Sequence, residues 1–254
     1  MKRNVYLIIL TIITILCIIA GTCYHLVRFG ISVAGGLPFI QTFMDAVTDW
    51  NDDDSSDNTE SASSTKTVSS SQNLDAFTSI QADMNVMDLK VVSGDSYSIQ
   101  YKASKKFVPE FEVKNNCLTI KQTQNVSFST ATRNAKCTVT VTVADSLDSV
   151  KIQSDVGDIT LSDQTITTFS LYADAGDIDL ENCTFTNMDI STDAGDIDID
   201  SKEDLSGYRI ALDTSYGDVT VNHKKQRHSY SHDGNLSGHT LTVSTDAGDI
   251  DLNY

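Results

Sequence analysis

The residues most able to do chemistry in this sequence are aspartates that recur around a glycine. The heptapeptide DAGDIDL occupies Asp174–Leu180 and again Asp246–Leu252, and DAGDIDI occupies Asp193–Ile199. Carboxylate oxygens are the ligands that Ca²⁺ prefers, and paired carboxylates act as acid and base in glycoside hydrolysis. Glycine and aspartate together also favour turns of the backbone. The motif therefore predicts a metal site, an acid–base site or a corner.

Calcium is the ion that these carboxylates would bind, because it takes six to eight oxygen ligands. The match to the calcium-binding nonapeptide G-G-x-G-x-D-x-U-x is only partial, since the repeat here is longer and the double glycine is missing. We prefer the alternative that the carboxylates accept backbone N–H groups at a turn. No other cofactor is expected. The candidate calcium ligands are Asp174, Asp177, Asp179, Asp193, Asp196 and Asp198.

A carbohydrate-active enzyme is a further alternative, because parallel β-helices include enzymes that cleave polysaccharides with paired carboxylates. Such a pair needs two environments that move the two pKa values apart. In this sequence the aspartates recur in one shared context. We therefore expect no catalytic residues and a protein that is not an enzyme.

The glycines of the motif mark a longer repeat. Their spacings are 19, 19, 22 and 31 residues, and the segments between them alternate apolar and polar residues without a helical period. This self-similarity predicts an all-β fold, a parallel β-solenoid in which each coil stacks on the one before it. The glycines expected at its corners are Gly157, Gly176, Gly195, Gly217 and Gly248.

The alternation predicts which side chains form the core. Residues of one parity point inward up to the residue before each glycine, such as Ala175 and Tyr216, and the parity changes across Gly-Asp. Unless residues 222–239 form a hairpin that covers it, the last coil, Leu241–Tyr254, exposes an edge that pairs weakly with another chain. The aliphatic column expected after the glycines is Ile159, Ile178, Ile197, Val219 and Ile250.

The interval between Gly217 and Gly248 holds the only dense basic cluster outside the N-terminus. Its histidines do not have the spacing of a zinc site. A solvated hairpin is the simpler interpretation, and an anionic polymer or headgroup is the ligand that the cluster would bind if it binds one. The candidate anion-binding residues are His223, Lys224, Lys225, Arg227 and His228.

The N-terminus predicts a membrane span. From Val5 to Val27 the only residue that can carry a charge is His25, and these 23 residues in a helix cross a hydrocarbon core about 30 Å thick. We predict a single-pass transmembrane signal anchor over residues 1–28, with a cleaved signal peptide as the alternative. The basic residues before it keep the N-terminus inside, so the bulk of the chain is expected outside the cell membrane.

Three further segments follow the predicted anchor. Residues 29–48 are interpreted as a juxtamembrane segment. Residues 49–73 are rich in Ser and Asp and bury little apolar surface, which predicts a disordered stalk. Residues 74–254 form the predicted solenoid domain.

Composition limits the partners and the covalent links. The chain has 35 acidic and 18 basic residues and a net charge of −17, so nucleic acid is repelled and is not an expected partner. Cys117 and Cys137 both lie in strand-like runs, and the sequence leaves open whether they form a disulfide. Three small buried thiols, including Cys183, are the interpretation that we prefer.

The repeats also resemble a known family. The segments CLTIKQ, CTVTVTV, VKIQSDVGDITL, FSLYADAGDIDL, MDISTDAGDIDI, YRIALDTSYGDVTV and LTVSTDAGDIDL follow one another between Leu74 and Leu252. This layout resembles the bacterial "putative adhesin" family, a domain of unknown function built from β-strand repeats. The resemblance supplies no catalytic residues. After CTVTVTV, where related domains commonly have a proline, this chain reads VADSLDSV, a departure that concerns only a local turn.

Together these features predict a non-catalytic, membrane-anchored cell-surface module for binding, adhesion or scaffolding. Its expected partners are the membrane through the anchor, and a cell-wall polymer, a glycan or another surface protein. The alternative is an accessory of envelope stress or signalling that acts through protein contacts.

Overall fold

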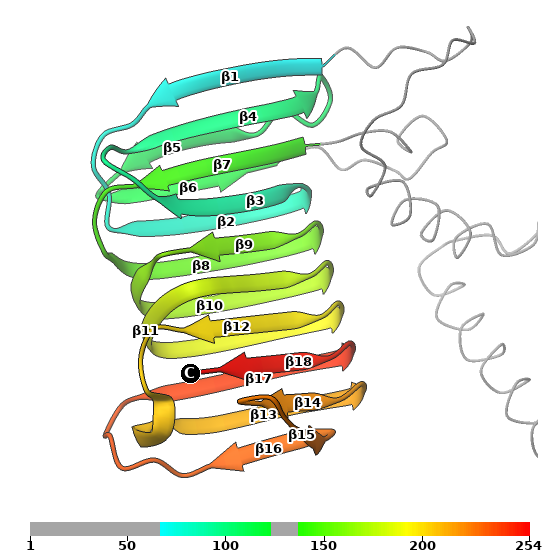
Figure 1. Ribbon diagram of the computed structural model, residues 1–254. Coiled ribbons are helices and arrows are strands. Elements are labelled where there is room, and N and C mark those ends of the chain that lie inside the picture. Colours follow the sequence, from blue (N-terminus) through cyan, green and yellow to red (C-terminus); the bar gives the residue numbers. More distant parts are fainter. Residues whose placement is uncertain (1–66, 123–136) are drawn as a thin grey trace, which may run out of the picture. The chain divides into compact units, whose positions relative to one another are not determined.

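The computed structural model describes residues 67–122 and 137–254, and this part of the chain consists mostly of strands (Figure 1). It also has one 3₁₀ turn at Leu205–Gly207. The predicted all-β class is therefore confirmed. The strands are β1 (Thr67–Asn73), β2 (Ser79–Val86), β3 (Asp88–Ser93), β4 (Ser98–Ser104), β5 (Glu110–Lys114), β6 (Cys117–Lys121), β7 (Cys137–Val143), β8 (Leu147–Val156), β9 (Ile159–Ser162), β10 (Thr165–Ala175), β11 (Ile178–Ala194), β12 (Ile197–Ser201), β13 (Arg209–Tyr216), β14 (Val219–Val221), β15 (Lys224–Arg227), β16 (Ser229–His232), β17 (Thr240–Ala247) and β18 (Ile250–Asn253).

The predicted anchor (1–28), the juxtamembrane segment (29–48) and most of the predicted stalk lie outside the described residues. The last part of that stalk, Thr67–Asn73, is strand β1 and not a disordered segment. Its serine-rich sequence buries little apolar surface, and backbone pairing with β4 holds it in place. Within the described ranges, no helix is long and apolar enough to cross a membrane.

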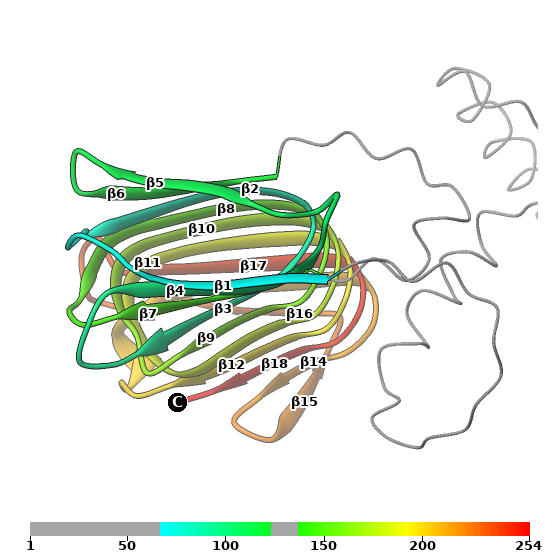
Figure 2. The ribbon, with the colours of Figure 1, turned by 90° about the horizontal axis from the view of Figure 1, so that it is seen from above.

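The strands form two layers around one core, and each repeat contributes one strand to each layer (Figure 2). Layer A contains, in spatial order, β1, β4, β7, β3, β9, the start of β11, β12, β18, β14 and β15. Layer B contains β5, β6, β2, β8, β10, the rest of β11, β17, β13 and β16.

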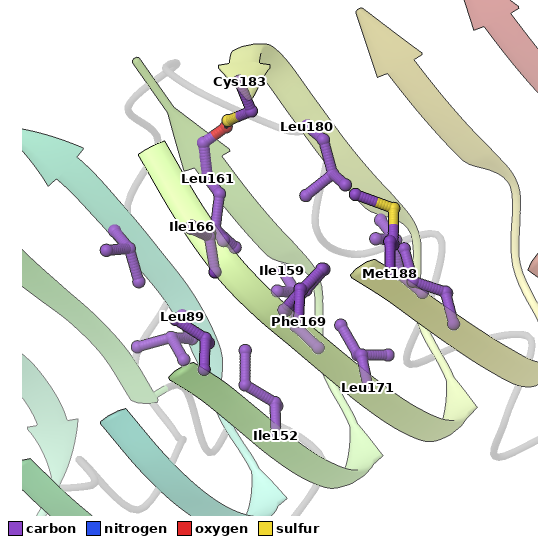
Figure 3. Packing of buried hydrophobic residues seen from close by; sticks show 14 of the residues in the cluster. Leu89, Ile152, Ile159, Leu161, Ile166, Phe169, Leu171, Leu180, Cys183 and Met188 are labelled. Carbon is purple, nitrogen blue, oxygen red and sulfur yellow. The ribbon is translucent and has the colours of Figure 1, made fainter. Parts of the chain in front are cut away.

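The repeats pair in parallel and in register, as the repeat predicted. In layer A, Leu180 is aligned with Leu161 on one side and with Ile199 on the other. In layer B, Phe169 is aligned with Met188. All five side chains are buried, and Figure 3 shows Leu161, Leu180, Phe169 and Met188 among the buried residues. Fully burying such a side chain stabilises the fold by about 1.5–3 kcal/mol, and each one needs the neighbouring repeats to cover it.

The spatial order of the repeats differs from the chain order. The C-terminal repeat, β17 and β18, lies between the repeat of β11 and β12 and the repeat of β13 and β14 (Figure 1). The predicted aliphatic column exists and is buried, but Ile250 separates Ile197 from Val219. The prediction that each coil stacks on the coil before it in the chain is therefore wrong for the C-terminal repeat. The 31-residue interval between Gly217 and Gly248 is long enough to build an end cap before the chain returns.

The inserted repeat also removes the open edge that the sequence placed at Leu241–Tyr254. β17 pairs with both β11 and β13, and β18 pairs with both β12 and β14. The strands that end the stack on this side are β15 and β16, which pair antiparallel with β14 and β13. The edge through which self-association was expected is therefore not open, because the backbone groups of the C-terminal coil already have partners on both sides.

The orientation predicted for the residue before each glycine is also wrong in part. Ala175 is buried, but Tyr216 is 81% exposed and Ala247 is exposed too, because the chain already begins to turn at this position. The last inward position lies two residues earlier. Thr214 is buried there, and its hydroxyl donates to the carbonyl oxygen of Gly248 at 2.8 Å.

The thiols of the described residues are free. Cys137 and Cys183 are buried and Cys117 is half-buried, so the disulfide between Cys117 and Cys137 that the sequence left open is absent. Burial raises the pKa of the Cys137 thiol to about 12, which keeps it protonated at neutral pH.

The corner glycines form a column in which neighbouring backbones approach closely. A Cβ on Gly176 would overlap the carbonyl oxygen of Gly157, and a Cβ on Gly195 would overlap that of Gly176. Gly217 and Gly248 meet the carbonyl oxygens of Gly248 and Gly195 in the same way. Gly176 also has a φ of 138°, which other residues adopt only with strain. The close approach keeps the corners of successive repeats directly over one another.

Replacing a corner glycine should be costly for this reason. We expect Gly176→Ala to lower the free energy of unfolding by roughly 3–5 kcal/mol, combining backbone strain with an overlap that no flexible side chain can relieve. Gly238→Ala is the control, because Gly238 has a φ of 80° but nothing within 4 Å of an added Cβ. Urea unfolding of both variants measures the difference, and equal losses would contradict the overlap.

Candidate functional site: the aspartate columns

The aspartate after each corner glycine belongs to one continuous ladder of hydrogen bonds. The backbone N–H of each aspartate donates to Oδ1 of the aspartate in the adjacent repeat. The bonds run from Asp158 to Asp88 at 3.2 Å, Asp177 to Asp158 at 3.0 Å, Asp196 to Asp177 at 2.9 Å, Asp249 to Asp196 at 2.8 Å and Asp218 to Asp249 at 2.8 Å. We call these six residues the corner ladder.

The corner ladder explains why an acidic residue follows each glycine. The sharp turn leaves an N–H group without a partner in the strand pairing, and a carboxylate accepts it more strongly than a neutral group does. Asp177 and Asp196, two of the candidate calcium ligands, therefore serve the backbone. At the end of the ladder, Asp218 forms an ion pair with Lys225 of the end cap.

A second column lies two residues further on, on the outer surface of layer A. Asp179, Asp198 and Asp251 are aligned there in adjacent strands, and Glu181 and Asp200 extend the same surface. A shallow depression of about 220 Å³ is lined by Asp179, Leu180, Glu181, Asp198, Asp200 and Asn253. We call this surface the acidic face.

The carboxyls of the acidic face are electrostatically unfavourable neighbours. Partial burial raises the pKa of Asp179 and Asp198 above the usual value, and adjacent carboxylates, chiefly Asp177 and Asp251 respectively, raise it further. Layer A thus presents negative charges that repel one another at the spacing of the strands. A cation placed on this face would relieve that repulsion.

The structure separates the six candidate calcium ligands into three columns. Asp177 and Asp196 belong to the corner ladder, and Asp179 and Asp198 belong to the acidic face. Asp174 and Asp193 lie before the corner, exposed on the layer B side. Across residues 67–122 and 137–254, no three His, Cys, Asp or Glu side chains are grouped so that they could hold a metal ion.

The basic cluster forms the end cap of the stack. His223 and Asn222 both have positive φ, 61° and 49°, and make the tight turn between β14 and β15. His228 donates through Nδ1 to the carbonyl oxygen of Gly217 at 2.7 Å. Lys225 is paired with Asp218, while Lys224 and Arg227 are exposed. The five candidate anion-binding residues are therefore neighbours, but two of them are engaged in closing the stack.

Sequence reasoning missed the first rung of the corner ladder. Asp88 follows Met87 and not a glycine, so a repeat defined by its glycines does not include it. The alignment of Leu89 with Ile159 shows that the corner is equivalent. A search for Asp followed by alternating aliphatic residues, without requiring glycine, would have found it.

A buried glutamine at the same corner was also missed. Gln122 is 4% exposed. Its Oε1 accepts the N–H groups of Asn85 at 3.1 Å and Val86 at 2.7 Å, and its Nε2 donates to the carbonyl oxygens of Val86 and Phe107 at 3.1 and 2.9 Å. One side chain thus replaces the backbone contacts that an adjacent repeat makes at the other corners. No periodic signal in the sequence marks this role.

The fold is an all-β repeat domain in which a glycine–aspartate corner recurs between two β layers. The comparisons with known proteins agree with this class. The family model described as Toastrack DUF4097 matches residues 76–203 and 122–253. The chain belongs to this family, whose function is unknown, and the resemblance to the "putative adhesin" family is confirmed. No curated protein matches the chain significantly.

Three solved structures are similar to this chain to different degrees. A "putative cell adhesion protein" from Clostridium sporogenes is 12% identical, covers 74% of this chain and 99% of its own, and has a TM-score of 0.54. A "putative adhesin" from Bacteroides fragilis is 16% identical, with 75% and 98% covered and a TM-score of 0.34. A "putative lipid binding protein" from Parabacteroides distasonis is 8% identical, with 74% and 98% covered and a TM-score of 0.27. The fold comparison rests on the first of these.

The corner ladder can be tested by removing one acceptor. We expect Asp177→Ala to lower the free energy of unfolding by about 1 kcal/mol, because the N–H of Asp196 loses its partner. Asp177→Asn keeps an oxygen in the same place and should cost clearly less. Urea unfolding at pH 7 distinguishes the two variants, and an equal cost would mean that charge and not the hydrogen bond matters here.

The acidic face predicts a pH dependence of stability. The folded state binds the proton of Asp198 more tightly than the unfolded state does. Its contribution to stability is therefore complete below the unfolded pKa of about 3.9, and it is lost as the pH rises through the raised folded pKa. Asp198→Asn should make the protein more stable at pH 7, with a gain that shrinks as the pH falls toward 4. Urea unfolding at both pH values measures it, with Asp213→Asn on layer B as the charge control.

Proposed function

We propose that this protein is a membrane-anchored, cell-surface β-solenoid that binds a cationic partner through its acidic face and performs no catalysis. Residues 1–28 would hold it as a single-pass protein in a bacterial cell membrane, with the repeat domain outside. The role is binding, adhesion or scaffolding.

The observation that carries this proposal is the alignment of Asp179, Asp198 and Asp251 in adjacent strands of layer A. Strand spacing places such side chains about 4.8 Å apart, on a surface that the strand pairing keeps rigid. A binding surface on a rigid element loses little conformational entropy when a partner binds. A column of like charges suits a partner whose positive charges also recur along a chain.

The chemistry of the face limits the partner. Carboxylates attract ammonium and guanidinium groups and repel phosphates, so an anionic wall polymer does not fit the acidic face. Amino groups of a cell-wall polymer or glycan fit it, as do Lys and Arg side chains of another surface protein. The name of the Clostridium sporogenes protein points to cell adhesion, but at 12% identity the proposal rests on the acidic face itself.

Charge-matched variants test the proposal. The full chain, purified in a mild detergent, is mixed with isolated cell-wall material and with an amine-bearing polysaccharide at two salt concentrations. We expect binding that weakens at high salt and that falls by about tenfold in the Asp198→Asn/Asp251→Asn variant, since two charge pairs are lost. Asp189→Asn/Asp213→Asn removes the same charge from exposed positions on layer B and should leave binding unchanged.

Two outcomes would count against the proposal. Equal losses in both double variants would mean that only net charge matters. Binding to neither material, with recovery of another membrane protein in a complex that the Asp198→Asn/Asp251→Asn variant forms equally well, would favour the signalling accessory instead.

A further inference from the structure

We propose that β1 joins two copies of this chain through antiparallel pairing of β1 with β1 of the second copy. β1 ends layer A on the side away from the end cap (Figure 1). On that side layer A continues past β3 with β7, β4 and β1, whereas layer B continues past β2 only with β6 and β5. β1 is therefore the outermost strand, and six of its seven residues are exposed. This inference does not depend on what the acidic face binds.

The pairing of β1 with β4 shows which backbone groups remain available. The N–H of Leu74 donates to the carbonyl oxygen of Tyr97 at 2.9 Å, and these two residues continue the β1–β4 register. In an antiparallel pair the hydrogen-bonded residues alternate, so Val68, Ser70 and Gln72 bond to β4. The N–H and C=O groups of the alternate residues point away from it, and within the described residues no strand pairs with them. These residues are Thr67, Ser69, Ser71 and Asn73.

The other terminal strands have the features that prevent such pairing. β5 reads EFEVK and β15 reads KKQR, each with three charged residues, and β16 has only four residues. Short length and charge are the usual protection of a sheet edge. β1 reads TVSSSQN, the longest of the four, with no charge and no proline. It is the one described edge that is open to another strand.

A second copy is the partner that fits this edge. With the two-fold axis at Ser70, Ser69 pairs with Ser71 and Thr67 with Asn73 of the other copy. All the outward N–H and C=O groups then meet in hydrogen-bonded pairs. The side chains brought opposite each other are Ser70 with itself, Val68 with Gln72, Ser69 with Ser71 and Thr67 with Asn73, so no like charges meet. For a chain with a net charge of −17, an uncharged edge is where two copies can approach with least repulsion.

Cysteine cross-linking tests the register. In this arrangement Ser70 faces its own symmetry mate in a non-hydrogen-bonded pair, with Cα atoms about 4.5 Å apart, which a disulfide spans. Ser71 lies diagonally from its mate at about 7–8 Å, which a disulfide does not span. We expect full-chain Ser70→Cys in detergent to form a covalent dimer on mild oxidation, with the bond mapped to residue 70 in both copies. Ser71→Cys and the unchanged chain should not. Equal yields from both variants, or none from Ser70→Cys, would overturn the proposal.

Proline substitution tests the backbone requirement. Ser71→Pro removes an outward N–H and leaves the bonds to β4 intact. It should weaken self-association of the full chain, measured by sedimentation over a range of concentrations, by at least about tenfold, because symmetry removes two hydrogen bonds. The melting temperature should stay close to that of the unchanged chain, which shows that the fold persists. A chain that is monomeric at every concentration, or a Ser71→Pro variant that associates as well as the original, would refute the pairing.

Discussion

The close approach of backbones at the corner column is the constraint on which the rest of this structure depends. At each corner the space that a Cβ would fill is taken by the carbonyl oxygen of the adjacent repeat. Because the corners stack so tightly, the strands on either side stay in register, and the aliphatic columns of both layers lie directly over one another. The requirement for glycine and the continuity of the core are two aspects of one geometry.

Two kinds of aspartate follow from this geometry, although the sequence repeats them as a single motif. Those of the corner ladder accept backbone N–H groups, and their charge is balanced in part by those donors. Those of the acidic face have neighbours of like charge, and partial burial together with these neighbours raises the pKa of Asp179 and Asp198. The first kind stabilises the corner. The second kind is tolerated because the corner holds the strands together, and this leaves its carboxylates available for a partner.

The sequence predicts the local features of the fold well and the long-range ones less well. Glycine spacing and side-chain alternation correctly predicted the parallel registers and the buried column from Ile159 to Ile250, because both depend on contacts that every repeat makes. The insertion of β17 and β18 before β13 depends on which two similar repeats pair, and similar repeats carry almost no information about that choice. Tyr216 was misplaced because alternation does not mark where a strand begins to bend.

For the candidate sites, too, the sequence predicted local features better than long-range ones. Backbone hydrogen bonding by Asp177 and Asp196 was the preferred interpretation of the motif, and the structure has those bonds. The sequence does not separate the corner ladder from the acidic face. That separation depends on which residues of different repeats lie close together in the folded chain. Asp88 and Gln122 stand where the pattern is broken, so periodic analysis passes over them. The sequence did not predict β1 for a related reason. A serine-rich segment has the composition of a linker, and only its pairing with a neighbouring strand shows that it is a strand.

The inserted C-terminal repeat has a consequence for how the chain is made. β13 has β17 as its parallel partner in layer B, and β17 begins only at Thr240, which follows β13 in the chain by more than twenty residues. Until that segment has been synthesised, β11 and β13 expose strand edges that have no lasting partner. The stack therefore cannot be completed in the order of translation, and a prematurely terminated chain carries unpaired edges that proteases can recognise.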